Sequence, residues 1–173
     1  MKKVQWISAV VALILISGCV STPAGINPVK GFQLERYLGK WYEIARLDHR
    51  FERGMTDVSA EYSMREDGGV RVLNSGLVVD EGKRKESEGK AYFVEDENTG
   101  HLKVSFFGPF YGSYVIFNLD DDYQYSMITG NDRSYLWLLS RTPVVSTELL
   151  SSFKRQAAEL GFATDELIID NER

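Results

Sequence analysis

The predicted fold begins at Tyr37-Leu38-Gly39-Lys40-Trp41-Tyr42-Glu43-Ile44-Ala45-Arg46, which opens the first of eight segments rich in β-forming residues. Turn sequences such as Asp67-Gly68-Gly69 separate these segments, since glycine adopts positive φ without steric cost. Eight consecutive strands with short turns favour an all-β, antiparallel up-and-down barrel, because closure leaves no exposed sheet edge. An open sandwich is the alternative. The predicted strands span residues 40–47, 57–65, 70–79, 87–94, 101–107, 112–119, 123–130 and 135–141.

A helix and a short strand are predicted after the eighth segment. The helix runs from Thr147 to Leu160, with Ser146 or Thr147 as its cap and Gly161 at its end. Leu167-Ile168-Ile169 then forms a short closing strand. We expect the helix to dock on the outer wall of the barrel; a membrane-binding face is the alternative, disfavoured by the lack of a dense basic face. The apolar face of the helix comprises Leu149, Leu150, Phe153, Ala157 and Leu160.

The composition limits the chemistry that this protein can perform. Its 173 residues are 43% hydrophobic and 12% aromatic, which is enough for one domain with a full core. A single cysteine excludes an intrachain disulfide and a cysteine-built zinc site, and two histidines disfavour an all-histidine site. We therefore expect no metal and no cofactor. The net charge of −5 argues against nucleic acid as a partner.

The first residues have the pattern of an export signal. Lys2 and Lys3 precede an apolar run, Val4 to Ile16, that is too short to span a bilayer but suits a secretory signal peptide. The run leads into Ser17-Gly18-Cys19, which resembles the lipobox of bacterial lipoproteins. Residues 1–18 are therefore interpreted as a lipoprotein signal peptide. The alternative is an ordinary signal peptide with a chance cysteine near its cleavage point.

The lipobox implies that Cys19 becomes acylated and anchors the protein to a membrane. No aspartate follows this cysteine, and by resemblance to bacterial lipoproteins that implies the outer membrane. Residues 19–30 contain two prolines and a glycine and are expected to form a lipidated tether. Residues 31–173 are expected to form the folded domain.

Three motifs carry a resemblance to the lipocalins. Gly39 and Trp41 match the Gly-x-Trp signature, and Arg141 ends the last predicted barrel strand as the third motif requires. The turn from Leu119 to Tyr123 matches the Thr-Asp-Tyr-like motif in part, with leucine in place of threonine. The chain is most similar to the bacterial outer-membrane lipoprotein lipocalins, the Blc group related to apolipoprotein D. Other stretches that resemble this group are 51–54, 88–93, 104–112 and 135–143.

The resemblance implies a barrel closed at one end, with Gly39, Trp41 and Arg141 at the closure. If Trp41 points inward, strand alternation directs Glu43, Ala45 and Leu47 inward too. From the residues alone, a filled core and a cavity are equally plausible; the resemblance favours a cavity. The facing of strand 123–130 is left open. The side chains expected to line the cavity are Ala45, Val58, Ala60, Tyr62, Val72, Asn74, Ala91, Phe93, Val104, Phe106, Tyr114, Ile116, Tyr135 and Trp137.

The loop after the first strand is expected to lie over the cavity mouth, where a ligand headgroup would sit. Its basic residues could meet a phosphate or carboxylate, although Asp48 and Glu52 interleave with them. A solvated loop histidine is the preferred interpretation of His49. Glu43 is interpreted as a buried charge that compensates Arg141 rather than as a general base. The candidate mouth residues are Arg46, His49, Arg50 and Arg53.

These features predict an outer-membrane, lipid-anchored lipocalin that binds a fatty acid, lysophospholipid or similar amphiphile for lipid storage or transport in envelope maintenance. No catalytic residue is predicted. One alternative is a lipocalin-type enzyme acting on a bound lipid, and another is a structural envelope protein that uses the barrel exterior. A homodimer is a further possibility if aromatic residues such as Tyr111 and Trp137 lie outside.

Overall fold

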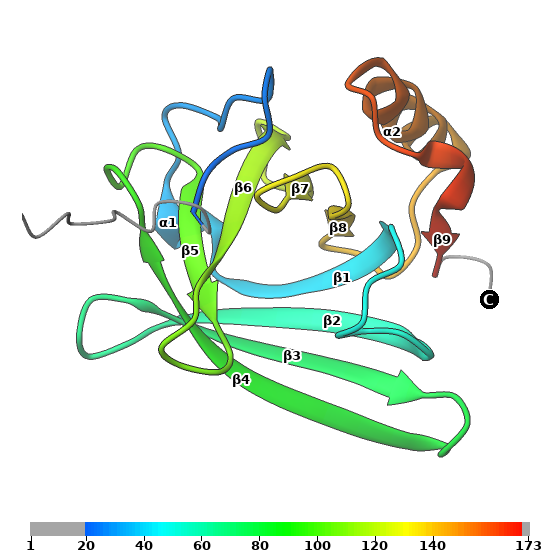
Figure 1. Ribbon diagram of the computed structural model, residues 1–173, viewed down its shortest axis with the longest axis horizontal. Coiled ribbons are helices and arrows are strands. Elements are labelled where there is room, and N and C mark those ends of the chain that lie inside the picture. Colours follow the sequence, from blue (N-terminus) through cyan, green and yellow to red (C-terminus); the bar gives the residue numbers. More distant parts are fainter. Residues whose placement is uncertain (1–19, 171–173) are drawn as a thin grey trace, which may run out of the picture.

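The computed structural model describes residues 20–170 of the chain (Figure 1). The predicted signal peptide, residues 1–18, and Cys19 lie outside the described residues. Within residues 20–170, no helix is both long and apolar enough to cross a membrane. The elements are α1 (Leu34–Tyr37), β1 (Gly39–Arg46), β2 (Met55–Met64), β3 (Val70–Val78), β4 (Lys83–Phe93), β5 (His101–Ser105), β6 (Gly112–Leu119), β7 (Tyr125–Thr129), β8 (Leu136–Ser140), α2 (Thr147–Glu159), a 3-10 turn (Thr164–Glu166) and β9 (Ile168–Ile169).

The strands form one antiparallel sheet that closes on itself. Each strand from β2 to β7 pairs with the next one along the chain, and β1 pairs with both β8 and β2. The predicted eight-stranded up-and-down barrel, with a C-terminal helix and a short final strand, is therefore confirmed. β9 does not join the barrel wall between two strands but extends the sheet beside β1.

Six strands differ in length from the sequence expectation, and β4 and β7 differ most. β4 begins at Lys83 rather than at residue 87, because pairing with β3 continues to Val78↔Lys83 and produces a long hairpin that projects from the barrel (Figure 1). β7 begins at Tyr125 rather than at residue 123, because Tyr123 takes a φ of 58° in the preceding turn.

The outer wall of the barrel carries the helix α2. The Oγ of Ser146 accepts a hydrogen bond from the backbone N–H of Leu149 at 3.2 Å and so caps the helix. Phe153 and Ala157 are fully buried and pack with wall residues that include Leu138. The apolar face of this helix thus covers the barrel, as predicted, and is not available to a membrane.

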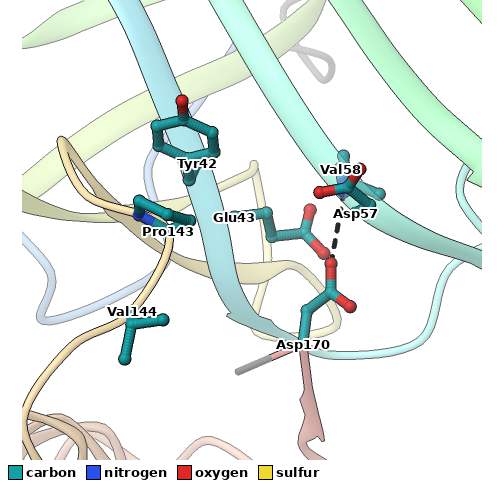
Figure 2. A pocket seen from close by; sticks show the side chains of 7 residues that line it. All are labelled: Tyr42, Glu43, Asp57, Val58, Pro143, Val144 and Asp170. Carbon is teal, nitrogen blue, oxygen red and sulfur yellow. Dashed lines mark hydrogen bonds between the residues drawn. The ribbon is translucent and has the colours of Figure 1, made fainter. Parts of the chain in front are cut away.

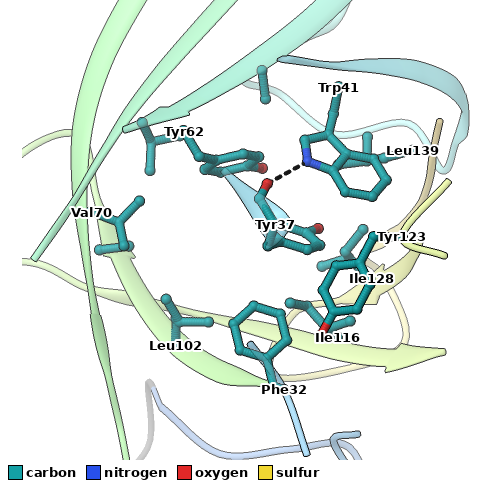
Figure 3. Packing of buried hydrophobic residues seen from close by; sticks show 13 residues of the cluster. Phe32, Tyr37, Trp41, Tyr62, Val70, Leu102, Ile116, Tyr123, Ile128 and Leu139 are labelled. Atoms are coloured by element: carbon teal, nitrogen blue, oxygen red, sulfur yellow. Dashed lines mark hydrogen bonds between the residues drawn. The ribbon is translucent and has the colours of Figure 1, made fainter. Parts of the chain in front are cut away.

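A second apolar cluster fills the barrel interior at its closed end (Figure 3). Phe32, Tyr37 and Trp41 meet there, and the indole N–H of Trp41 donates to the carbonyl of Tyr37 at 2.7 Å. Arg141 covers this end, with its guanidinium carbon 4.0 Å from the centre of the Trp41 ring. The same guanidinium donates hydrogen bonds to the carbonyls of Arg36, Lys40 and Tyr123.

The segment before α1 packs along the barrel instead of forming the tether that was expected. Val29 exchanges backbone hydrogen bonds with Gly100 and Ile116 at 2.9 Å, and Ile26 is buried beneath α2. Nearer the N-terminus, the hydroxyl of Ser113 donates to the carbonyl of Ser21 at 2.7 Å. The described part of the predicted tether is therefore bound to the domain, because its backbone groups find partners on β6 and beside β5.

Candidate functional site

A β-bulge in β1 decides which side chains of that strand face the barrel interior. The register of β1 against β8 shifts between Glu43↔Leu139 and Ala45↔Leu138. Because Leu139 belongs to the interior cluster and Leu138 to the cluster under α2, Glu43 faces inward and Ala45 faces outward. Arg46, the next residue, faces inward opposite Trp137.

The prediction that Ala45 and Leu47 face inward is therefore wrong. Both side chains pack in the cluster under α2. Simple alternation fails because the bulge inserts one extra residue into the strand and reverses the parity beyond it. Arg46, expected at the mouth, instead enters the barrel.

The remaining cavity candidates lie on the inner wall or at its rim. Five are buried in the interior or packed as part of its cluster, namely Ala60, Tyr62, Val72, Ala91 and Ile116. Five others face the same cluster and stay partly accessible to solvent, namely Phe93, Val104, Phe106, Tyr114 and Trp137. Val58 is buried beside Gly76, Asn74 pairs with Ala60, and Tyr135 stacks on Trp137 at 5.9 Å.

The closed half of the interior contains a chain of tyrosine hydroxyls. The Tyr114 hydroxyl lies 2.8 Å from both the Tyr37 and the Tyr62 hydroxyls, and Tyr37 also donates to the Oγ of Ser126 at 3.3 Å. Burial raises the pKa of Tyr37 to about 12 and raises the pKa values of Tyr62 and Tyr114 well above their usual range. These hydroxyls therefore stay protonated and satisfy one another. The facing of β7, which the sequence left open, is now clear: Ser126 and Ile128 face the barrel interior.

The open half contains a buried charged cluster built from β1 and the following loop. A guanidinium nitrogen of Arg46 lies 2.5 Å from the Glu43 carboxylate, and both side chains are 2% exposed. Arg46 also donates to the carbonyls of Glu52 and Met55, which fastens the loop over the barrel. The Glu52 carboxylate lies 2.9 Å from Nε2 of His49 and accepts from the indole N–H of Trp137 at 3.2 Å.

The two carboxyl groups of this cluster lie close enough to shift each other's pKa. Burial, followed by the nearby Glu52 charge, raises the pKa of Glu43 well above its usual range despite Arg46. Burial would also raise the pKa of Glu52, but the His49 contact and the bonds from Glu43 and Trp137 outweigh it and lower the pKa. Glu43 is therefore the harder of the two carboxyl groups to ionise, and the cation that compensates it is Arg46, not Arg141 as expected.

The other mouth candidates also differ from expectation. His49 is 7% exposed and lies 5.0 Å from the Trp137 ring, so the solvated-histidine interpretation is wrong. Arg53 forms an exposed ion pair with Asp48 at 2.7 Å, and Arg50 lies 4.9 Å over the Phe51 ring. The β1–β2 loop folds back onto the barrel because Arg46 donates to the carbonyls of Glu52 and Met55. No local sequence pattern predicts these contacts.

A gap in the wall leads to the charged cluster (Figure 2). β1 leaves β2 after Tyr42↔Ser59, and a pocket of about 80 Å³ between them is lined by Glu43 and Val58. Asp170 closes part of this gap by accepting a hydrogen bond from the backbone N–H of Val58 at 3.2 Å. A larger hollow of about 400 Å³ lies over the outward-facing residues of β1 to β4 and is lined by Lys40, Tyr42, Asp57, Ser59, Glu61, Leu73, Ser75, Arg84 and Glu86.

Some residues of the site were not foreseen in the sequence. Phe32 and Tyr37 come from the segment before β1, and Tyr123 comes from a turn, yet all three enter the interior cluster. Their aromatic character was a usable signal, but no strand alternation applies to them. Trp137 proves to face inward, so it cannot support the dimer contact considered above, whereas Tyr111 lies outside against Tyr92.

A closed antiparallel barrel with a sealed base, a helix on its wall and an inward-facing apolar lining defines the lipocalin class. A family model described as "Lipocalin-like domain" matches residues 32–172. This chain belongs to that lipocalin family.

Individual relatives place it more narrowly, in the Blc group. It is 54% identical over 156 residues to "Outer membrane lipoprotein Blc" of Vibrio cholerae, covering 90% of this chain and 91% of the relative. It is 46% identical to the Blc of Escherichia coli K12, with 97% and 96% covered. Rat apolipoprotein D is 30% identical over 79% of this chain and 72% of its own. Insecticyanin from the tobacco hornworm shares the fold at a TM-score of 0.69 and 20% identity, covering 88% and 87%.

Proposed function

We propose that this protein is a lipid-anchored outer-membrane lipocalin that holds a fatty acid, a lysophospholipid or a similar amphiphile inside its barrel. The observation that carries the proposal is the inner wall itself. Phe93, Val104 and Phe106 face the interior, yet solvent still reaches them. Burial of an acyl chain against this solvent-accessible apolar surface is favourable, by about 0.8 kcal/mol for each buried methylene.

The proposed ligand lies with its acyl chain against this wall and its polar head near the charged cluster. The base offers no exit, because Phe32, Tyr37 and Trp41 fill it. At the other end, Trp137 and Glu52 present an indole and a carboxylate beside His49. Arg46 already contacts the Glu43 carboxylate and donates to the carbonyls of Glu52 and Met55. We therefore propose that it does not bind the headgroup itself but positions Glu43 and the loop.

Cys19 is the proposed attachment point of the anchor, and residues 1–18 are the proposed signal peptide, which is cut off immediately before Cys19. The support is the lipobox-like sequence together with the printed names of the Blc relatives, which are outer membrane lipoproteins. Storage or transport of lipids in envelope maintenance is the proposed task. No catalytic constellation supports an enzyme among the described residues, so binding is preferred.

Native mass spectrometry of the full chain, purified from outer membranes in a mild detergent, tests the binding proposal. We expect one co-purified amphiphile per chain, displaced by added palmitate or lysophosphatidylethanolamine. Val104→Trp fills the inner wall and should abolish binding, whereas Val144→Trp, on an exposed connection, should retain it. A chain that binds neither probe would refute the carrier role. A bound lipid whose mass changes with time would favour the enzyme alternative.

A further inference from the structure

Most of the large exposed apolar side chains among the described residues lie at one end of the barrel. Four of the seven large hydrophobic side chains that are exposed within residues 20–170 lie in loops between odd-numbered strands and the strands that follow. They are Phe51 in the β1–β2 loop, Val79 in the β3–β4 loop, and Phe107 and Phe110 in the β5–β6 loop. In an up-and-down barrel, these loops all share one end.

That end is opposite the sealed base. The base contains α1 and the segment before it, which bond to the β4–β5 and β6–β7 loops: the N–H of Phe32 donates to the carbonyl of Asn98, and Arg36 donates to the carbonyl of Asp121. β5 leaves the base and ends in the β5–β6 loop. The exposed side chains of Phe107 and Phe110, 72% and 79% accessible, therefore stand at the open end.

The N-terminal segment brings the proposed lipid anchor to this same end. Along the segment from Phe32 backwards, the bonds move from Ile116 to Ser113 on β6, that is, away from the base. The carbonyl of Ala24 accepts from Arg133 in the β7–β8 loop, which also lies at the open end. Residue 19 is two residues from Ser21, and two residues reach at most about 7 Å.

The β5–β6 loop has the chemistry that a bilayer interface accepts. Phe107 and Phe110 are apolar and lie six and three residues before Ser113, the residue that holds the N-terminal segment. Beside them, the ammonium of Lys103 lies 5.3 Å from the centre of the Tyr111 ring, which puts a cation and an amphipathic ring next to the two phenylalanines. Apolar tips flanked by lysine and tyrosine suit the boundary between acyl chains and anionic headgroups.

We infer that the β5–β6 loop inserts Phe107 and Phe110 into the bilayer that holds the lipid on Cys19, so that the open end of the barrel faces that membrane. The inference rests on the proposed anchoring at Cys19. It adds an orientation: an amphiphile would pass between the bilayer and the barrel without crossing the aqueous space around the protein.

Fluorescent labelling of the full, acylated chain in vesicles tests the orientation. The acylated thiol of Cys19 does not react with a maleimide, so Phe107→Cys or Phe110→Cys provides a single labelling site for an environment-sensitive dye. The vesicles contain phosphatidylethanolamine, phosphatidylglycerol and a phospholipid with a nitroxide on its acyl chain. Matched controls are Val144→Cys and Met64→Cys, which are 66% and 52% exposed and lie away from the open-end loops.

We expect the dye at positions 107 and 110 to be quenched several-fold more strongly than at 144 or 64. Equal quenching at all four positions, or none at 107 and 110, would overturn the docking. A second result would also overturn it. If the dye becomes more shielded from water in nitroxide-free detergent as the protein concentration rises, a second copy of the chain covers the loop. The mass of the purified chain separates the two proposals: without acyl chains the anchoring itself fails, whereas an acylated chain without quenching refutes only the docking.

Discussion

Glu43 and Arg46 stand three residues apart in one β-strand, yet both side chains enter the barrel and form a buried ion pair with a 2.5 Å contact. In a regular strand, residues three apart point to opposite faces. The bulge at Ile44 and Ala45 removes that opposition. The pair links the inner wall to the loop over the mouth, because Arg46 also holds the carbonyls of Glu52 and Met55.

Replacing one member of this ion pair should destabilise the protein more than replacing both members. Arg46→Leu leaves Glu43 buried without its cation, and we expect a loss of about 3–5 kcal/mol in the free energy of unfolding. The double variant Glu43→Leu with Arg46→Leu removes both charges and should recover most of that loss. Urea denaturation of the two variants checks this. A double variant no more stable than Arg46→Leu would contradict the importance of charge compensation.

Removal of Arg141 should loosen the sealed base. Arg141→Met loses the contact with the Trp41 ring and three hydrogen bonds to carbonyls, and we expect a loss of roughly 2 kcal/mol, moderated by its partial exposure. Amide hydrogen exchange should accelerate in α1, whose Arg36 carbonyl loses its partner. Arg155→Met, on the exposed face of α2, is the control and should leave that exchange unchanged.

Stability should fall in alkali through the buried tyrosines. The pKa of Tyr37 is raised from 10.0 to about 12 by burial, so its contribution is fully present below pH 10 and is lost as the pH rises towards 12. A shift of that size corresponds to about 3 kcal/mol. Ultraviolet absorption of tyrosinate, followed with the unfolding midpoint, measures this loss. Tyr37→Phe should flatten the profile, whereas Tyr111→Phe, on the outer surface, should not.

The docking of α2 should depend on Phe153. This side chain is fully buried between the helix and the wall, so Phe153→Ala should cost about 3–5 kcal/mol through lost burial and a cavity. Lys154→Ala changes an exposed neighbour on the same helix and should have little effect. Thermal unfolding followed by circular dichroism compares the two. Equal stability of both variants would show that the helix is not held by this face.

The sequence by itself determined the number and order of the barrel strands, the amphipathic helix and the proximity of Trp41 to Arg141. These features depend on residues close in the chain, on turn glycines and on motifs of a known family. The periodicity of Leu149, Phe153 and Ala157 sufficed for the helix face, since helical spacing is local. Alternation likewise identified the inner faces of β2, β4 and β5 through residues such as Ala60 and Ala91.

Only the tertiary structure decided the inner face of β1, the burial of His49 and the course of the N-terminal segment. The bulge that turns Ala45 outward and Arg46 inward arises from the register with β8, a strand almost a hundred residues later in the chain. His49 is buried because Trp137 and Glu52 surround it, and Ser21 is held because Ser113 lies opposite. Each outcome depends on a contact between distant residues, and local patterns of polarity do not contain such contacts.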